Sequence, residues 1–129
     1  MPGNNLNIPS PLRSLFSEEL SKGLITLRRD LHRHPELSFH EERTAARLYD
    51  ELAHLKPATL DCLEKNAVIA RIAGRNPRAP MVAVRADIDA LPIQEATGLA
   101  FSSQHPGVMH ACGHDVHAAW GVGAASLLT

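Results

Sequence analysis

Hydrophobic residues recur at spacings of three and four along the first third of the chain, a pattern that predicts amphipathic helices. The first run contains Leu12, Leu15, Leu20, Leu24, Leu27 and Leu31. It ends before Pro35, because a proline ring disfavours helical geometry in the residue that precedes it. Ser10 and Pro11 offer an N-cap and a first helical residue. Gly23 inside the run costs about 1 kcal/mol relative to alanine, so a start near Ser17 is the alternative.

A second helix is predicted between Ser38 and Pro57. Ser38 and Glu41 match a capping box, in which a serine and a glutamate three residues later satisfy each other's backbone donors. The apolar stripe of this helix consists of Thr44, Leu48, Leu52 and Leu55. We therefore expect Ser38 to cap the helix.

Three short runs after the second helix predict β-strands, at 59–63, 67–72 and 81–86. The third is apolar except for Arg85, which suits a strand buried in the interior of a sheet. The stretch that follows, 87–113, has no hydrophobic periodicity, and loops of such length are usually functional. A last helix is predicted over 114–128, with its Trp and leucines on the buried side. This order of helices and strands predicts an α/β fold.

Composition narrows the classes of function. The 129 residues fit one domain, and a net charge of -1 provides no basic field for nucleic acid or anionic membranes. Residues 1–9 should form a disordered tail without the features of a signal peptide, and no apolar run is long enough to span a membrane. Cys62 and Cys112 form no close pair, so we expect a cytoplasmic protein with reduced thiols. Residues 127–129 lack a helix-ending signal, so we expect the domain, 10–129, to continue in a longer polypeptide.

Eight histidines are the unusual feature of the composition, and three of them flank a cysteine. Cys112 and His114 stand on either side of Gly113, where a tight turn can bring both side chains to one point. A thiolate with an imidazole suits zinc, manganese, cobalt or nickel. His117 shares a helical face with His114 and could bind or support a metal, and Asp115 could orient an imidazole. The alternative is a buried cysteine beside surface histidines.

Two carboxylates, Asp87 and Asp89, follow the predicted strand 81–86, at the end where open α/β sheets place their ligands. Alternation along an extended chain puts both on one side. Like charges at such short separation need a metal, another cation or a proton to offset their repulsion. Arg85 could pair with either carboxylate, and the alternative is one capping and one solvated aspartate.

Three stretches together resemble the co-catalytic metallopeptidase family of aminoacylases and carboxypeptidases. They are 29–41 (RDLHRHPELSFHE), 84–95 (VRADIDALPIQE) and 109–118 (MHACGHDVHA). The branch that they resemble contains hippurate hydrolase and the auxin-amino-acid hydrolases. The resemblance implies an incomplete three-layer α/β/α catalytic domain of the zinc-peptidase kind.

The resemblance also assigns site residues. Cys112 and His114 match the first two ligands of a two-metal site, and Asp89 matches the acid that orients a ligand. Asp87 stands where other branches carry a metal-binding histidine, and it is our second catalytic candidate. His32 belongs to a stretch that resembles a structural signature of the family, so it receives no catalytic role.

The activity that the resemblance implies is metal-dependent hydrolysis of the amide bond of a small N-acyl amino acid. The cofactors would be two divalent cations, zinc or manganese, with cobalt or nickel also suitable. The family's general-base glutamate, its further ligands and its lid and dimerisation domain follow this stretch, so we expect a homo-oligomeric parent enzyme and an inactive 129-residue chain. The alternatives are a small metal-binding protein without catalysis and an inactive remnant.

Overall fold

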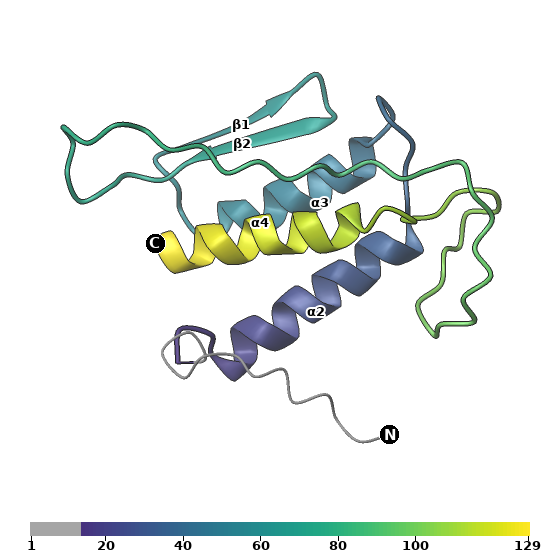
Figure 1. Cartoon of the computed structure of the whole chain (residues 1–129). Helices are drawn as coiled ribbons and strands as arrows, with labels where there is room; N and C mark the ends of the chain where they lie inside the picture. The colour runs from purple at the N-terminus through teal and green to yellow at the C-terminus, as the bar shows by residue number, and fades with distance from the viewer. Residues whose placement is uncertain (1–13) are drawn as a thin grey trace.

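A computed structural model describes residues 14–129 as three helices and a two-stranded sheet (Figure 1). The elements are α2 (Glu18–Arg33), α3 (Glu42–Ala53), β1 (Thr59–Leu63), β2 (Ala67–Arg71) and α4 (His114–Leu128). This mixture confirms the predicted α/β class. No helix within 14–129 is both long enough and apolar enough to cross a membrane. The expected tail, 1–9, and the possible helix start at Ser10 lie outside the described residues.

Helix α2 begins at the later of the two predicted starts. The side-chain oxygen of Ser17 accepts a hydrogen bond from the backbone amide of Leu20 at 3.0 Å, as an N-cap residue does. Glu18 and Glu19 occupy the first turn, where the positive end of the helix dipole favours acidic side chains. The helix ends at Arg33, as the following proline requires.

Helix α3 is capped by a different residue from the one that the sequence predicted. Its first turn receives no hydrogen bond from Ser38, which donates instead to the Asp89 carboxylate at 2.7 Å. The carboxylate of Glu36 accepts from the backbone amides of Arg43, at 3.1 Å, and Thr44, at 2.7 Å. The predicted capping box is therefore wrong. The helix begins four residues after Ser38, so this serine does not stand at the N-cap position.

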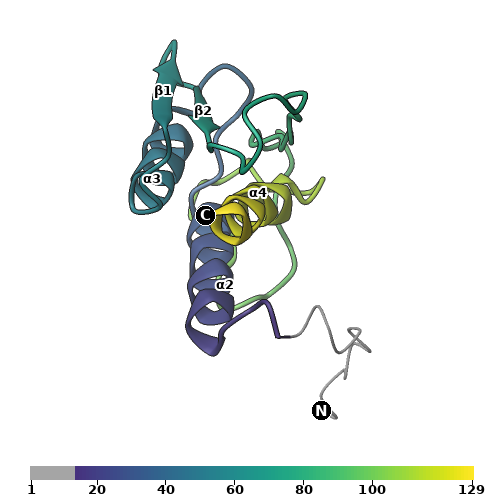
Figure 2. The ribbon, with the colours of Figure 1, turned by 90° about the vertical axis from the view of Figure 1, so that its left-hand side faces the viewer.

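Strands β1 and β2 form an antiparallel hairpin that lies over α3 (Figure 2). Both were predicted, and β2 ends one residue earlier than expected. The connecting turn places Glu64 and Lys65 at positive φ, and the amide of Asn66 donates to the carbonyl of Leu63 at 3.1 Å. Two successive residues at positive φ give the turn whose twist matches that of a hairpin.

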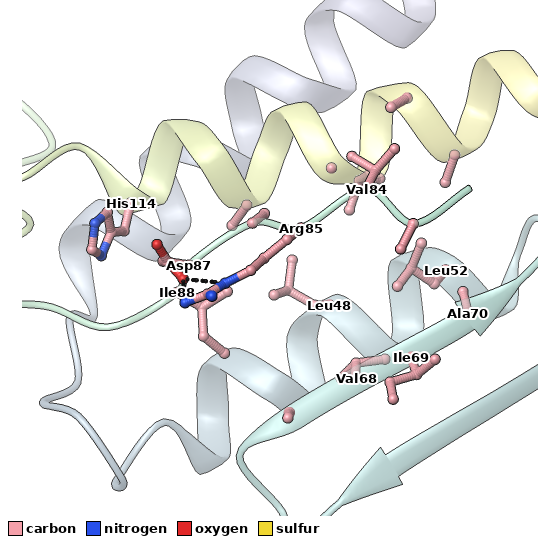
Figure 3. A pocket seen from close by; sticks show the side chains of 18 of the residues that line it. Leu48, Leu52, Val68, Ile69, Ala70, Val84, Arg85, Asp87, Ile88 and His114 are labelled. Atoms are coloured by element: carbon pink, nitrogen blue, oxygen red, sulfur yellow. Dashed lines mark hydrogen bonds and ion pairs between the residues drawn. The ribbon is translucent and has the colours of Figure 1, made fainter. Parts of the chain in front are cut away.

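The predicted strand 81–86 is extended but pairs with no other strand within the described residues, so this prediction is wrong. A strand needs a neighbour's donors and acceptors, and an open groove of about 920 Å³ separates this segment from β2 (Figure 3). Met81 and Val84 are consequently 78% and 69% exposed. Pairing resumes beyond the segment, where Ala90 forms a parallel bridge with Leu37 and Leu91 an antiparallel bridge with Met109.

The core lies where α4 packs against α2 and α3. A side chain on Gly123 would place its Cβ 2.9 Å from a methyl group of Leu24, so this glycine allows α4 to approach α2 closely. Trp120, Leu127 and Leu128 are 66%, 41% and 64% exposed. The prediction that they face the core is therefore wrong, because small residues form the buried stripe of α4. The buried hydrophobic cluster consists of Leu27, Leu31, Leu48, Ala118 and Val122.

Replacing Glu36 by alanine should lower the free energy of unfolding by about 1 kcal/mol, the usual cost of losing a helix cap. The matched control is Glu42→Ala, which removes an exposed acid from the first turn of the same helix. Urea denaturation followed by circular dichroism measures both. Equal losses in the two variants would show that Glu36 does not cap α3.

Candidate metal centre

The N-terminal turn of α4 carries the histidines of the predicted metal motif. Gly113 has a φ of 81°, in the left-handed region that favours glycine, and the chain turns there into the helix. His114 is the first helical residue and His117 follows almost one turn later, so both lie on one face. Their rings stack, with centroids 5.3 Å apart. The turn therefore presents two imidazoles side by side.

Asp87 completes a cluster with these two histidines. One ligand atom from each of Asp87, His114 and His117 lies within 4.8 Å of the other two. Figure 3 shows Asp87, at the end of the extended segment, close to His114 at the start of α4. Two imidazoles and a carboxylate are donors that zinc and manganese accept. The residues therefore fit a divalent cation.

Asp89 holds the imidazole of His114 in one orientation. Nδ1 of His114 lies 2.8 Å from Oδ1 of Asp89 and 3.0 Å from its backbone carbonyl oxygen. Both partners are acceptors, so Nδ1 carries the proton and donates it. Nε2 is left with a free electron pair, which is how a carboxylate prepares a histidine for metal binding.

The Asp89 carboxylate is held from a second side by Ser38, whose hydroxyl donates to Oδ2 at 2.7 Å. This hydrogen bond lowers the pKa of Asp89, partial burial opposes it, and the hydrogen bond and charge of His114 lower the pKa further. Asp89 is therefore ionised at neutral pH. The sequence assigned Ser38 to a helix cap, and no local signal connects two residues that are 51 positions apart.

The Asp87 carboxylate also binds Arg85, whose Nη2 and Nε lie 2.7 and 3.0 Å from Oδ1. The Arg85 side chain is 87% exposed. An ion pair this open to water contributes little energy. Asp87 can thus exchange Arg85 for another cation at small cost, whereas Asp89 is fixed by two partners.

Cys112 lies exposed on the turn that precedes α4 and is not a member of the three-residue cluster. The structure thus brings together His114, Asp87 and Asp89 of the predicted site residues. It adds His117, which the spacing of three from His114 had indicated. A ligand role for Cys112 stays a prediction.

Asp115 orients an imidazole, as the sequence suggested, but it is that of His32. Nδ1 of His32 lies 2.8 Å from Asp115 Oδ2, and Nε2 lies 3.1 Å from Glu95 Oε1. Burial alone would raise the pKa of Glu95, but hydrogen bonds from Thr97, the backbone amide of Ser103 and His32 outweigh it and lower the pKa to about 2. A buried hydrogen-bonded network that joins Asp115, His32 and Glu95 therefore begins at the residue that follows His114.

Known proteins that resemble this chain include peptidases and amidohydrolases. Residues 83–129 match the model of the peptidase family M20/M25/M40. The chain is 47% identical over 112 residues to an N-acyl-L-amino acid amidohydrolase of Geobacillus stearothermophilus, covering 87% of this chain and 30% of the relative. It is 53% identical over 106 residues to an N-acetylcysteine deacetylase of Bacillus subtilis (strain 168), covering 81% and 28%. The chain thus spans about 30% of the length of these relatives.

A solved structure agrees with the sequence matches. A Bacillus subtilis protein described as a dinuclear metal-binding peptidase of the M20 family superposes with a TM-score of 0.81 and 50% identity, over 87% of this chain and 32% of that protein. These matches confirm the family resemblance inferred from the three sequence stretches. The narrower resemblance to hippurate hydrolase stays a prediction.

Glu95→Gln should remove an acid-sensitive part of the stability. The folded pKa of about 2 lies below the ordinary 4.5, so Glu95 stabilises the fold above pH 4.5 and loses this contribution as the pH falls toward 2. The contribution at neutral pH is on the order of 3 kcal/mol, since each pKa unit corresponds to about 1.4 kcal/mol. Urea titrations between pH 6 and 3 measure the free energy of unfolding of both proteins. The difference between wild type and variant should shrink as the pH falls. Glu64→Gln, on the exposed hairpin turn, is the control, and a difference independent of pH would contradict the assignment.

Proposed function

We propose that this chain, part of which matches the peptidase family M20/M25/M40, belongs to an enzyme that hydrolyses the amide bond of N-acyl amino acids with two divalent cations. The observation that carries the proposal is the cluster of Asp87, His114 and His117, with Asp89 bonded to His114. The names of the amidohydrolase and deacetylase relatives support the substrate class. Hippurate, an N-benzoyl amino acid, belongs to the same class.

The site residues would divide the work as follows. His114 would present Nε2 as a ligand, and Asp89 would strengthen it by accepting a hydrogen bond from Nδ1. Cys112 is the second proposed ligand, and Asp87 and His117 lie where they could complete the set. When bound, the cations, zinc or manganese with cobalt or nickel also suitable, would polarise the amide carbonyl and lower the pKa of the attacking water.

The remaining expectations stay predictions. They are a homo-oligomeric whole protein, a cytoplasmic location, and a small-molecule substrate without a nucleic-acid or membrane partner. A net charge of -1 supports the exclusion of nucleic acid, because such proteins need a basic surface.

The 129-residue chain should bind zinc or manganese in calorimetric titrations, with His114→Ala and Cys112→Ser each weakening the affinity by more than about tenfold. Loss of even an outer partner of a ligand costs roughly 10- to 100-fold. His54→Ala and Cys62→Ser are matched controls on exposed positions away from the cluster. If Cys112→Ser binds like wild type while His114→Ala does not, the ligands are those of the observed cluster and Cys112 is not among them.

Asp89→Asn should reduce kcat/KM for an N-acetyl amino acid by about 10- to 100-fold, because an amide cannot match a carboxylate in supporting a histidine ligand. The assay uses a polypeptide that contains this chain and spans the length of its relatives, with amine release as the readout. Asp61→Asn, exposed on β1, is the control. Metal binding by that polypeptide without amide hydrolysis would favour a non-catalytic metal-binding protein.

A further inference from the structure

We propose that Asp115 is a positioning residue: held by Arg28 and His32 of α2, it sets the direction in which α4 presents His114 and His117. The inference rests on the metal centre proposed above. Arg28, just before the stretch 29–41, and His32, within it, both contact the residue next to His114, which the sequence did not show.

The contacts of Asp115 are short, with His32 buried and Arg28 partly buried. The Asp115 side chain is 0% exposed, and Oδ2 accepts from Arg28 Nε at 2.7 Å and from His32 Nδ1 at 2.8 Å. Arg28 and His32 are four residues apart and therefore project from the same face of α2. A buried carboxylate is tolerated only with a charged or hydrogen-bonded partner, and α2 supplies both donors. Asp115 consequently points at α2.

Helical geometry transmits this orientation to the histidines. Successive residues of an α-helix are about 100° apart, so His114 and His117 project about 100° and 160° away from Asp115. With Asp115 directed at α2, both imidazoles are directed away from α2, to the side where Asp87 and Asp89 lie. A rotation of the first turn of α4 would break the Asp115 contacts and the His114–Asp89 hydrogen bond together.

His32 also ties the preceding loop to the same point. Its Nε2 faces Glu95 Oε1 at 3.1 Å, and Glu95 Oε2 accepts from the amide of Ser103 at 2.6 Å. The ring of Phe101 stands edge-on to His32, with centroids 5.4 Å apart, and lies 4.8 Å from the guanidinium carbon of Arg28. The side chains of His32 and Asp115 are 4% and 0% exposed, and electrostatic interactions are less screened in a buried site.

Stability alone does not account for the arrangement. The leucines of α2 already pack against Ala118 and Val122 of α4. Buried ion pairs often contribute no more stability than apolar residues of the same size would. What a hydrogen-bonded carboxylate adds to apolar packing is a unique rotation of the helix.

The test is cobalt binding by the full 129-residue chain carrying Asp115→Asn. We expect cobalt affinity to fall by about tenfold or more, the range for losing a partner that orients a ligand, and the visible absorption of bound cobalt, which reports ligand geometry, to change. Leu24→Ala is the control: it weakens α2–α4 packing near Gly123 and should leave affinity and spectrum unchanged. If Asp115→Asn lowers stability but leaves both as in wild type, the role is structural and the proposal is overturned.

Two substitutions of His32 keep the proposal testable if Asp115→Asn fails to fold. In His32→Asn, the amide nitrogen takes the place of Nδ1 and can keep the hydrogen bond to Asp115. In His32→Gln, the amide nitrogen takes the place of Nε2 and can keep only the hydrogen bond to Glu95. His32→Asn should therefore retain most of the cobalt affinity, and His32→Gln should lose about tenfold or more, as expected for a lost outer partner. Equal affinities in the two variants would contradict positioning through Asp115.

A separate outcome shows whether the proposed metal centre, rather than the positioning role of Asp115, is wrong. If wild type and His114→Ala bind cobalt alike, the proposed function is wrong at this site. Positioning is then decided from nitrogen NMR of the histidine rings in the metal-free chain. Asp115→Asn should shift the signals of His114 and His117, and Leu24→Ala should not. Unshifted signals in Asp115→Asn would overturn the inference.

Discussion

The packing of α4 on α2 is the constraint on which the rest of the structure depends. Leu27 and Leu31 meet Ala118 and Val122 across this contact, and Gly123 lets the two helices approach closely. Small residues on one helix facing leucines on the other give a close fit, which is sensitive to small shifts. This contact sets how closely α4 lies on α2, and the bonds of Asp115 to Arg28 and His32 accompany it at the start of α4.

Asp89 connects the packed helices to the candidate metal centre. Its carboxylate accepts from Ser38, ahead of α3, and from His114, at the start of α4. Its neighbour Ala90 donates from its amide to the carbonyl of Glu36 at 2.7 Å, so the backbone is fixed there as well. Three segments far apart in sequence thus meet at one carboxylate, and the hydrogen bonds from Ser38 and His114 lower the pKa of Asp89 below its ordinary value.

Periodicity and local signals predicted α2, α3, α4 and the hairpin, because these elements are determined by residues close in sequence. The motif around His114 also indicated that His114 and His117 lie on one face, since a helical turn places its own residues, while the ligand role of Cys112 stays a prediction. The sequence could not show that Glu36 rather than Ser38 caps α3, or that Asp115 pairs with Arg28 across 87 positions. Such contacts depend on how the helices pack, and no local pattern records that. The strand predicted at 81–86 failed for a related reason, because a strand exists only with a neighbour.

The groove between β2 and 81–86 has a consequence for the two aspartates. On its rim, apolar side chains such as Val82 and Ile69 are 84% and 51% exposed, so the segment leading to Asp87 is held by few contacts. Asp89 lies two residues further on, where backbone pairing has resumed and two side chains bind its carboxylate. An orienting acid must be rigid, whereas a group that exchanges Arg85 for a metal must move. These differences support the proposed orienting role of Asp89 and a ligand role for Asp87.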